Sequence, residues 1–163
     1  MSVLKVIHYP ESVLTKKAKA VDVIGQKELR LIRDMIDTMY QEDGVGLAAP
    51  QVAASKRIIV VSPNARRGEE RVYINPEIIE SSQEEEIGLE GCLSLPDISC
   101  EVRRAKKIRF RALDINGTEQ IEQVCDFPAR VIQHEIDHLN GVLLIDRVDF
   151  HRRQALLGTY RRL

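Results

Sequence analysis

Apolar residues recur at helical spacing early in the chain and predict an amphipathic helix over residues 26–42. An α-helix turns once every 3.6 residues, so positions three and four apart share one face. Four apolar residues form that face: Leu29, Ile32, Ile36 and Met39. Gly44 follows the last of them and predicts the end of the helix.

The middle of the chain carries patterns that predict strands. The clearest is an alternation with two arginines, typical of a strand with one buried face, and its apolar members are Ile108, Phe110 and Ala112. Asn116-Gly117 follows and favours a hairpin turn, after which the chain returns over residues 118–125. Three other apolar segments also predict extended structure: residues 57–61, 72–79 and 87–93.

A second helix is predicted over residues 128–140, with Asp126 as its cap and Gly141 at its exit. A short third helix is predicted within residues 149–160. Strands that lie together between an early and a late helix favour an α+β fold with antiparallel strands. We expect these strands to surround the second helix, with an N-terminal helix and a short C-terminal helix beside them.

Composition places the chain in a broad class without assigning a function. With 163 residues we expect one domain, residues 1–163. A formal net charge of −1 gives no general attraction to nucleic acid or anionic membrane, and no apolar run is long enough to span a bilayer. Three cysteines without a C-x-x-C pair, and no signal-peptide pattern, favour the reducing cytoplasm.

The sharpest local motif is His134-Glu135-Ile136-Asp137-His138, which falls on the second predicted helix. Residues four apart lie one above the other on a helix, so both imidazoles can reach one metal ion. Glu135 lies between the histidines and an apolar arc formed by Ile132, Ile136 and Leu139. A chance match on an amphipathic helix is an equal alternative for the motif taken alone.

Two histidines leave a catalytic metal site short of its usual third protein ligand. Cys92 is one candidate, because Gly91 beside it allows close backbone approach and Pro96 marks a predicted strand end. A small buried apolar role is the alternative for Cys92, and we prefer it for Cys100 and Cys125. Acidic residues and the two other histidines, His8 and His151, also remain candidates.

The segment Gly44-Val-Gly-Leu-Ala-Ala-Pro-Gln51 follows the first predicted helix. Its glycines permit close backbone approach, and Gln51 carries both a donor and an acceptor that can hold a carbonyl oxygen. The segment lacks the lysine of a phosphate-binding loop. A helix-ending turn with a tight packing contact is at least as good an interpretation as a functional loop.

Together the segments G-V-G-L-A-A-P-Q, E-G-C-L-S and Q-H-E-I-D-H resemble the three signature motifs of peptide deformylases, in the same order. The resemblance extends from V-I-H-Y-P near the start to H-L-N-G. The family removes the formyl group from the initiator methionine of new polypeptides and releases formate. The resemblance therefore implies a metallo-amidase whose partners are N-formylmethionyl nascent peptides.

The resemblance also implies a role for each matching residue. Cys92, His134 and His138 bind one divalent ion, with Fe²⁺ as the native metal and Zn²⁺, Ni²⁺ or Co²⁺ as possible substitutes. Glu135 acts as general base and then acid on a metal-bound water. Gln51 and the Leu93 amide stabilise the oxyanion, and the Gly46 backbone helps to bind the substrate.

Methionine in the substrate requires an apolar pocket near the metal. Residues adjacent to the motifs are candidate walls, and an ordinary core role is a nearly equal alternative for all of them: Val45, Leu89 and Val131. The chain departs from some bacterial members at Ser99, where those carry an arginine. Substrate contacts beyond the first residue are therefore not predicted.

The basic C-terminal tail carries five arginines against Asp149: Arg147, Arg152, Arg153, Arg161 and Arg162. Some bacterial deformylases dock such a tail on the ribosome, and a solvated basic helix is the simpler alternative.

Two other classes of protein are alternatives to a deformylase. A metalloprotease would take a later third ligand such as Asp146, Asp149 or His151, and a structural metal module would leave Glu135 without a purpose.

Overall fold

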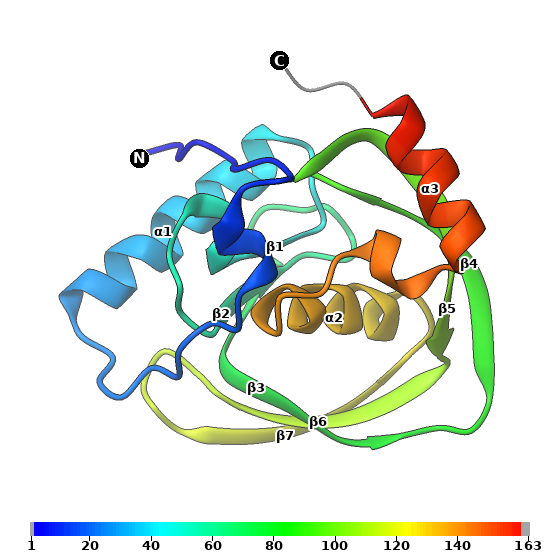
Figure 1. Ribbon diagram of the computed structural model, residues 1–163. Helices are drawn as coiled ribbons and strands as arrows, with labels where there is room; N and C mark the ends of the chain where they lie inside the picture. Colours follow the sequence, from blue (N-terminus) through cyan, green and yellow to red (C-terminus); the bar gives the residue numbers. More distant parts are fainter. Residues whose placement is uncertain (1, 161–163) are drawn as a thin grey trace.

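The computed structural model describes residues 2–160 and forms an α+β fold with antiparallel sheets (Figure 1). Its helices are α1 (Gln26–Gln41), α2 (Asp126–Leu139) and α3 (Phe150–Thr159). Short 3-10 helices are η1 (Ser12–Thr15), η2 (Ala49–Val52) and η3 (Leu144–Arg147). The strands are β1 (Gly46–Ala48), β2 (Ile58–Val61), β3 (Arg71–Ser81), β4 (Glu85–Cys92), β5 (Leu95–Ala105), β6 (Lys107–Leu113) and β7 (Glu119–Cys125).

Seven strands form two separate antiparallel sheets in the described part of the chain. Five of them lie in the order β1-β2-β3-β6-β7, and β4 pairs only with β5 in a long hairpin. Every pair of neighbouring strands in the five-stranded sheet is antiparallel. The α+β prediction is therefore confirmed, including the N-terminal helix and the short C-terminal one.

At strand β2, both faces of the five-stranded sheet are covered by other parts of the chain. Successive side chains of a strand point to opposite faces. Ile59 packs in the cluster that contains α2, whereas Ile58 and Val60 pack in the cluster that contains α1. From α1 this second cluster takes Ile32, Met35 and Met39. The β-branched part of the predicted run, Ile58–Val61, is thus fully buried, whereas Arg57 before it is only partly buried.

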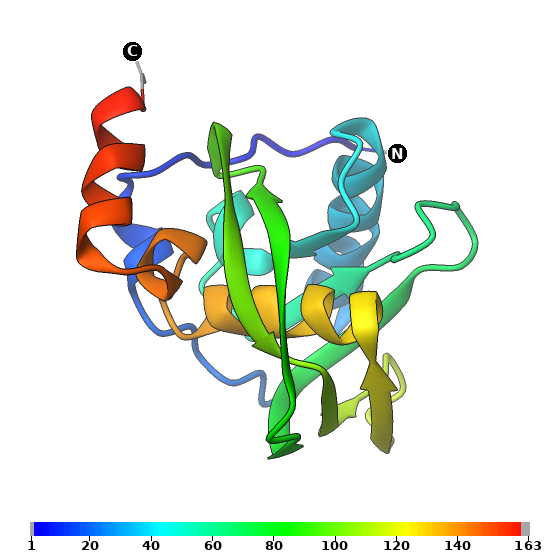
Figure 2. The same ribbon diagram turned by 90° about the vertical axis from the view of Figure 1, so that its right-hand side faces the viewer.

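The apolar arc predicted on the second helix faces this sheet. Ile132, Ile136 and Leu139 of α2 are buried against Tyr73 and Phe110, whose rings meet edge to face with centroids 5.0 Å apart. The opposite side of α2 faces the β4–β5 hairpin, which crosses it (Figure 2). This opposite side carries the histidine motif, so the helix contributes to the core and to the candidate site at once.

Three local predictions are wrong. The segment after α1 was expected to be a loop, but it contains β1 and η2. Residues after Pro96 were expected to leave the strand, yet β5 runs from Leu95 to Ala105. Asp126 was expected to cap α2, but Cys125 holds the cap position without a side-chain hydrogen bond, because Asp126 is already the first helical residue and has a φ of 59°.

The C-terminal segment packs on the hairpin through its own apolar cluster. Leu95, Ile98, Cys100 and Val102 of β5 contact residues before and within η3 and α3, among them Leu144 and Leu156. Asp149 caps α3 by accepting a hydrogen bond from the Arg152 amide. Arg161 and Arg162 of the predicted basic tail lie outside the described residues.

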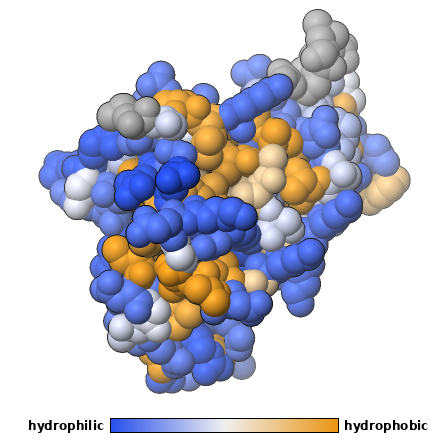
Figure 3. All heavy atoms as spheres, turned by 90° about the vertical axis from the view of Figure 1, so that its left-hand side faces the viewer, coloured by the Kyte–Doolittle hydropathy of each residue, from blue (hydrophilic) through white to orange (hydrophobic). Residues whose placement is uncertain are grey.

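The surface on the α1 side mixes hydrophilic and hydrophobic areas (Figure 3). Among the described residues, no helix has the length and apolar character that crossing a bilayer requires.

Candidate metal centre

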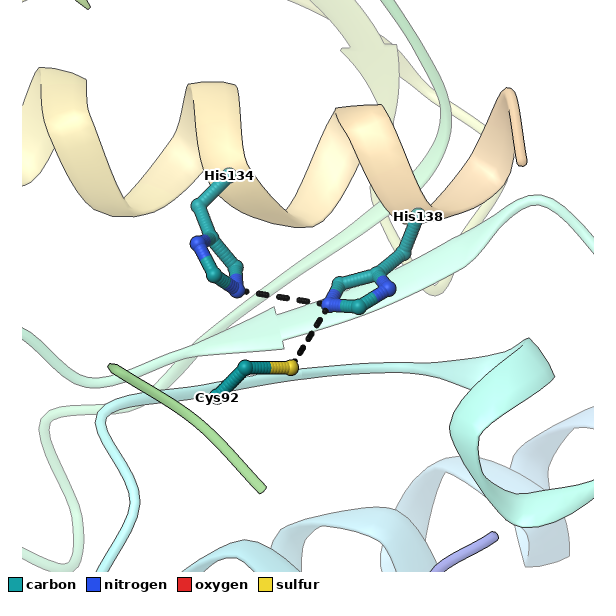
Figure 4. Close-up of side chains that lie close together, drawn as sticks. All are labelled: Cys92, His134 and His138. Atoms are coloured by element: carbon teal, nitrogen blue, oxygen red, sulfur yellow. Dashed lines mark hydrogen bonds between the residues drawn. The ribbon is translucent and has the colours of Figure 1, made fainter. Parts of the chain in front are cut away.

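Three side chains that could hold a metal ion converge between α2 and the end of β4 (Figure 4). The Sγ atom of Cys92 lies 3.4 Å from Nε2 of His138, and this Nε2 lies 3.3 Å from Nε2 of His134. One ligand atom from each residue falls within 4.8 Å of the others. Within residues 2–160 this is the one group of three or more such side chains.

The spacing of these donors suits a tetrahedral metal ion. Bond lengths of about 2.0–2.1 Å to nitrogen and about 2.3 Å to sulfur place neighbouring tetrahedral donors roughly 3.3–3.6 Å apart. The observed separations of 3.3 and 3.4 Å fall in or close to that range. Three donors from this chain also leave a fourth position open, as in catalytic sites. The residues therefore fit a divalent ion.

Local geometry brings Cys92 to the histidines. His134 and His138 are one turn apart on α2, and both are buried. Cys92 ends β4, where the register with β5 shifts between Gly91 and Cys92 so that Cys92 pairs with Leu95. The chain turns at once over residues 93 and 94, and the Ser94 amide lies 3.4 Å from the Cys92 sulfur, which it can stabilise as a thiolate.

A buried carboxylate orients the first histidine. Glu90 Oε1 lies 2.9 Å from Nδ1 of His134, which leaves Nε2 directed at the other two donors. Burial opposes ionisation of Glu90, but hydrogen bonds from Arg104 and His134 outweigh it and hold its pKa well below the usual range. A carboxylate behind a ligating imidazole is a common support of metal sites because it fixes the ring and its tautomer.

Glu90 belongs to a layer of charges that is buried except at its outer end, Arg147, and that we call the ionic layer: Glu90, Arg104, Arg130, Asp137 and Arg147. Arg104 donates two hydrogen bonds of 2.9 Å to Glu90 and one of 2.5 Å to Asp137. Arg130 donates to Glu90 at 2.8 Å, and Arg147 donates twice to Asp137 at 2.9 and 2.6 Å. The layer thereby ties α2 to the hairpin and to η3.

Charge around the histidines favours a cation between them. Burial alone would lower the pKa of His134, yet hydrogen bonds with Cys92 and Glu90 raise it well above its ordinary value. Burial and the neighbouring His134 lower the pKa of His138 well below its ordinary value. His138 is therefore neutral, the form that ligates metals, while the Glu90 carboxylate supplies negative charge.

Glu135 lies beside the three donors, and one of its carboxylate oxygens is buried without a hydrogen bond from residues 2–160. Its side chain is buried, and burial raises its pKa to about 7 from an ordinary 4.5. Oε1 has no hydrogen-bond partner among the described residues. Gly46 makes room for this carboxylate, because an added Cβ there would lie 2.5 Å from Oε2. A buried carboxyl group without a partner is costly, which is typical of a functional position.

Gln51 points into the same site from η2. Its Oε1 accepts a hydrogen bond of 2.9 Å from the Ala48 amide. Its Nε2 donates to Ser94 Oγ at 3.1 Å and lies 3.7 Å from the Cys92 sulfur. The amide is therefore held in one orientation with a donor close to the metal donors. Leu93 lies in the turn after Cys92 and lines the adjoining pocket.

A cavity of about 710 Å³ opens onto this site. Every catalytic and substrate-contacting residue predicted from sequence lines it: Val45, Gly46, Gln51, Leu89, Leu93, Val131 and Glu135. Sequence reasoning missed Phe127 and Arg130, which also line it. Phe127 and Arg130 lie seven and four positions before His134 on α2, which puts them on the same side of the helix as His134.

The other candidate ligands have different places. Cys100 is buried in the hairpin cluster and Cys125 is exposed. Asp146 accepts a hydrogen bond from the Leu143 amide, and Asp149 caps α3. His8 lines the cavity, but the group of three metal donors includes neither it nor His151.

Comparisons with known proteins agree with this site. Residues 3–154 match the family model described as polypeptide deformylase. A peptide deformylase of Pseudothermotoga lettingae is 47% identical over 146 residues, covering 90% of this chain and 83% of the relative. Peptide deformylase 1 of Clostridium perfringens is 52% identical over 136 residues, covering 83% of this chain and 91% of the relative.

Solved structures show the same likeness. A peptide deformylase from Legionella pneumophila superimposes with a TM-score of 0.92 at 38% identity, covering 96% of this chain and 92% of that one. The enzyme from Thermotoga maritima gives a TM-score of 0.87 at 42% identity, covering 91% of this chain and 99% of that one. The chain belongs to the polypeptide deformylase family. It is accordingly an enzyme of the deformylase class.

Proposed function

We propose that this chain is a metal-dependent hydrolase that removes the N-formyl group from the initiator methionine of newly made polypeptides. The observation that carries the proposal is the convergence of one thiol and two imidazoles beside a buried carboxylate oxygen without a partner. A structural metal site would have no use for that carboxylate. The substrate class comes from the family, whose relatives are named peptide deformylases.

In this proposal α2 is the metal-binding helix at the centre of a single catalytic domain, residues 1–163. Cys92, His134 and His138 hold one divalent ion, natively Fe²⁺, with Zn²⁺, Ni²⁺ or Co²⁺ as substitutes. When bound, such an ion acts as a Lewis acid and makes water a competent nucleophile near neutral pH. The single thiolate gives the site one negative charge and makes the Fe²⁺ form sensitive to oxygen.

Glu135 moves the proton in the proposed reaction. Its unpartnered Oε1 accepts a proton from the attacking water and passes it to the departing amine, leaving formate and a free N-terminus. A pKa near 7, raised by burial, suits a group that must both accept and donate a proton near neutral pH. Gly46 keeps the carboxylate in place by presenting no side chain to it.

Gln51 and the Leu93 amide are the proposed donors to the formyl oxygen as negative charge develops on it. Hydrogen bonds from Ala48 and to Ser94 hold the Gln51 amide in advance, so little reorganisation is needed in the transition state. Loss of one such donor typically costs about 3 kcal/mol of barrier. The Gly46 backbone contributes to binding the peptide chain.

The cavity beside the site is the proposed seat of the methionine side chain. Val45, Leu89 and Val131 line it and give it apolar walls. A formyl group is small, so a close fit beside Glu135 would exclude larger acyl groups. We further propose that the enzyme works in the cytoplasm, where nascent chains emerge, and that the basic C-terminal tail contacts the ribosome.

The proposal is tested by measuring formate release from formyl-Met-Ala-Ser with anaerobically purified protein, together with its metal content. We expect one metal per chain and rapid release. Glu135→Gln should keep the metal and lose activity by about a hundredfold to ten-thousandfold, the usual contribution of a general base. Loss of metal together with activity, or equal cleavage of internal peptide bonds, would contradict the proposal.

A further inference from the structure

A smaller cavity shares two lining residues with the large cavity. The smaller cavity has a volume of about 210 Å³ and lies between β4 and α2. Phe127 and Arg130 line both cavities. Phe127 is 48% exposed at the surface, whereas Arg130 is only 9% exposed. Of the two residues that line both cavities, only Arg130 is therefore buried.

The Arg130 guanidinium cannot move aside easily. Nη1 donates to Glu90 Oε2 and to the Val102 carbonyl, each at 2.8 Å, and Nη2 donates to the Glu86 carbonyl at 2.8 Å. Displacing the head group would leave a buried charge and buried acceptors without partners, which is costly. Arg130 thus behaves as a fixed wall rather than as a flexible surface arginine.

Gly88 on β4 leaves space for the Arg130 side chain. A Cβ added at Gly88 would lie 2.9 Å from both Cζ and Nε of Arg130, closer than real Cβ contacts allow. The other glycine of β4, Gly91, has no such close neighbour, because a Cβ added there would lie 3.7 Å from the Ile98 carbonyl oxygen, an ordinary contact. β4 therefore has no side chain at position 88, where the Arg130 guanidinium packs against the strand.

We propose that Arg130, seated against Gly88, is a specificity-determining residue that sets the depth of the pocket for the first side chain of the substrate. This inference rests on the proposed function, because it assigns the larger cavity to that side chain. The arginine closes the inner end of the pocket. A side chain as long as methionine fits in front of it, and a longer one meets the guanidinium.

The kinetic test compares two formylated tripeptides, formyl-Met-Ala-Ser and the analogue whose first side chain is an unbranched octyl group. Arg130→Ala joins the cavities, so kcat/KM for the octyl substrate should rise relative to the methionine substrate by about tenfold or more, the usual effect of apolar pocket volume. Arg130→Lys keeps a long cationic side chain and should preserve the wild-type ratio.

Weakened support of His134 through Glu90 would slow both substrates equally and leave the ratio unchanged. An unchanged ratio in Arg130→Ala, or an equal rise in Arg130→Lys, overturns the proposal. Absence of formate release from formyl-Met-Ala-Ser by the wild-type chain would instead count against the proposed function.

The packing of Arg130 against Gly88 is tested separately from catalysis, by thermal unfolding of the metal-loaded protein. Gly88→Ala should lower Tm strongly in the wild-type background, because the new Cβ meets the guanidinium. The same substitution should have little effect in the Arg130→Ala background. Equal decreases in both backgrounds would show that Arg130 does not occupy this space, and would overturn the matched pair.

Discussion

The two sides of α2 are held by opposite kinds of interaction. Toward the five-stranded sheet the helix buries Ile132, Ile136 and Leu139 against apolar strand residues. Toward the β4–β5 hairpin it presents buried charges, with Asp137 bound to Arg104 and Arg130 bound to Glu90. One helix therefore has an apolar attachment on one side and an ionic attachment on the other.

The difference indicates a division of labour. Apolar burial is not directional, so it holds the helix on the sheet without fixing its rotation closely. Charged hydrogen bonds are directional, and a buried ion pair adds little net stability because of the cost of removing charges from water. We infer that the ionic layer serves geometry: it places Glu90, and with it Cys92 two residues later, against His134.

Breaking the ionic attachment at its centre should have the largest effect. Arg104→Met leaves Glu90 and Asp137 buried with fewer partners, and we expect a loss of about 3–5 kcal/mol in the free energy of unfolding. Chelator competition should show metal affinity reduced by about tenfold to a hundredfold. Exposed Arg103 gives the control, because Arg103→Met should change unfolding by at most about 0.5 kcal/mol.

Breaking the apolar attachment should cost stability alone. Ile59 is fully buried in the cluster with α2, and Ile59→Ala should lower the free energy of unfolding by about 2–5 kcal/mol. Ile59→Val should cost only about 0.5–1.5 kcal/mol. Metal affinity of the folded protein should remain at the wild-type value in both variants. A loss of affinity as large as in Arg104→Met would remove the distinction between the two sides.

The outer end of the ionic layer should matter less than its centre. Arg147 binds Asp137, but its side chain is 47% exposed and Asp137 keeps Arg104 as a partner. Solvent screening reduces such a pair, so Arg147→Ala should cost no more than about 1 kcal/mol in denaturant unfolding. A cost equal to that of Arg104→Met would show that the layer depends on its exposed end.

The smallest effect concerns a partly buried ion pair, Glu28 with Lys56, at the start of α1. Hydrogen bonds from Lys56 and the Gly25 amide lower the pKa of Glu28 to about 2, from an ordinary 4.5. A carboxyl group with a depressed folded pKa stabilises above its unfolded pKa and loses that effect as the pH falls from 4.5 toward 2. Glu28→Gln should therefore flatten the dependence of Tm on pH in that window, and an unchanged slope would contradict this.

The sequence predicts the apolar side of α2 well. The spacing of Ile132, Ile136 and Leu139 marks the buried face, and the interval between His134 and His138 brings both imidazoles together on any helix. The position of Cys92 depends instead on a strand pairing between distant segments. The residues by themselves favoured it only weakly among three cysteines, and the resemblance to a family decided the choice.

The ionic side is what sequence reasoning missed. Strand β5 alternates buried Ile98, Cys100 and Val102 with polar residues, and this alternation could have predicted the strand. The alternation ends at Arg104, a charged residue at a buried position, which obscures the strand. Arg130 was missed for the same reason. A buried arginine is predictable only with its partners, and Glu90 lies 40 positions away in sequence.

The central claim is that the ionic layer holds one thiolate and two imidazoles around an ion that keeps an open position. X-ray absorption at the zinc edge of the zinc-loaded chain tests it most directly. We predict one sulfur at about 2.3 Å, two imidazole nitrogens at about 2.0–2.1 Å and one further light donor. A spectrum without sulfur, or one with three imidazoles, would contradict the account.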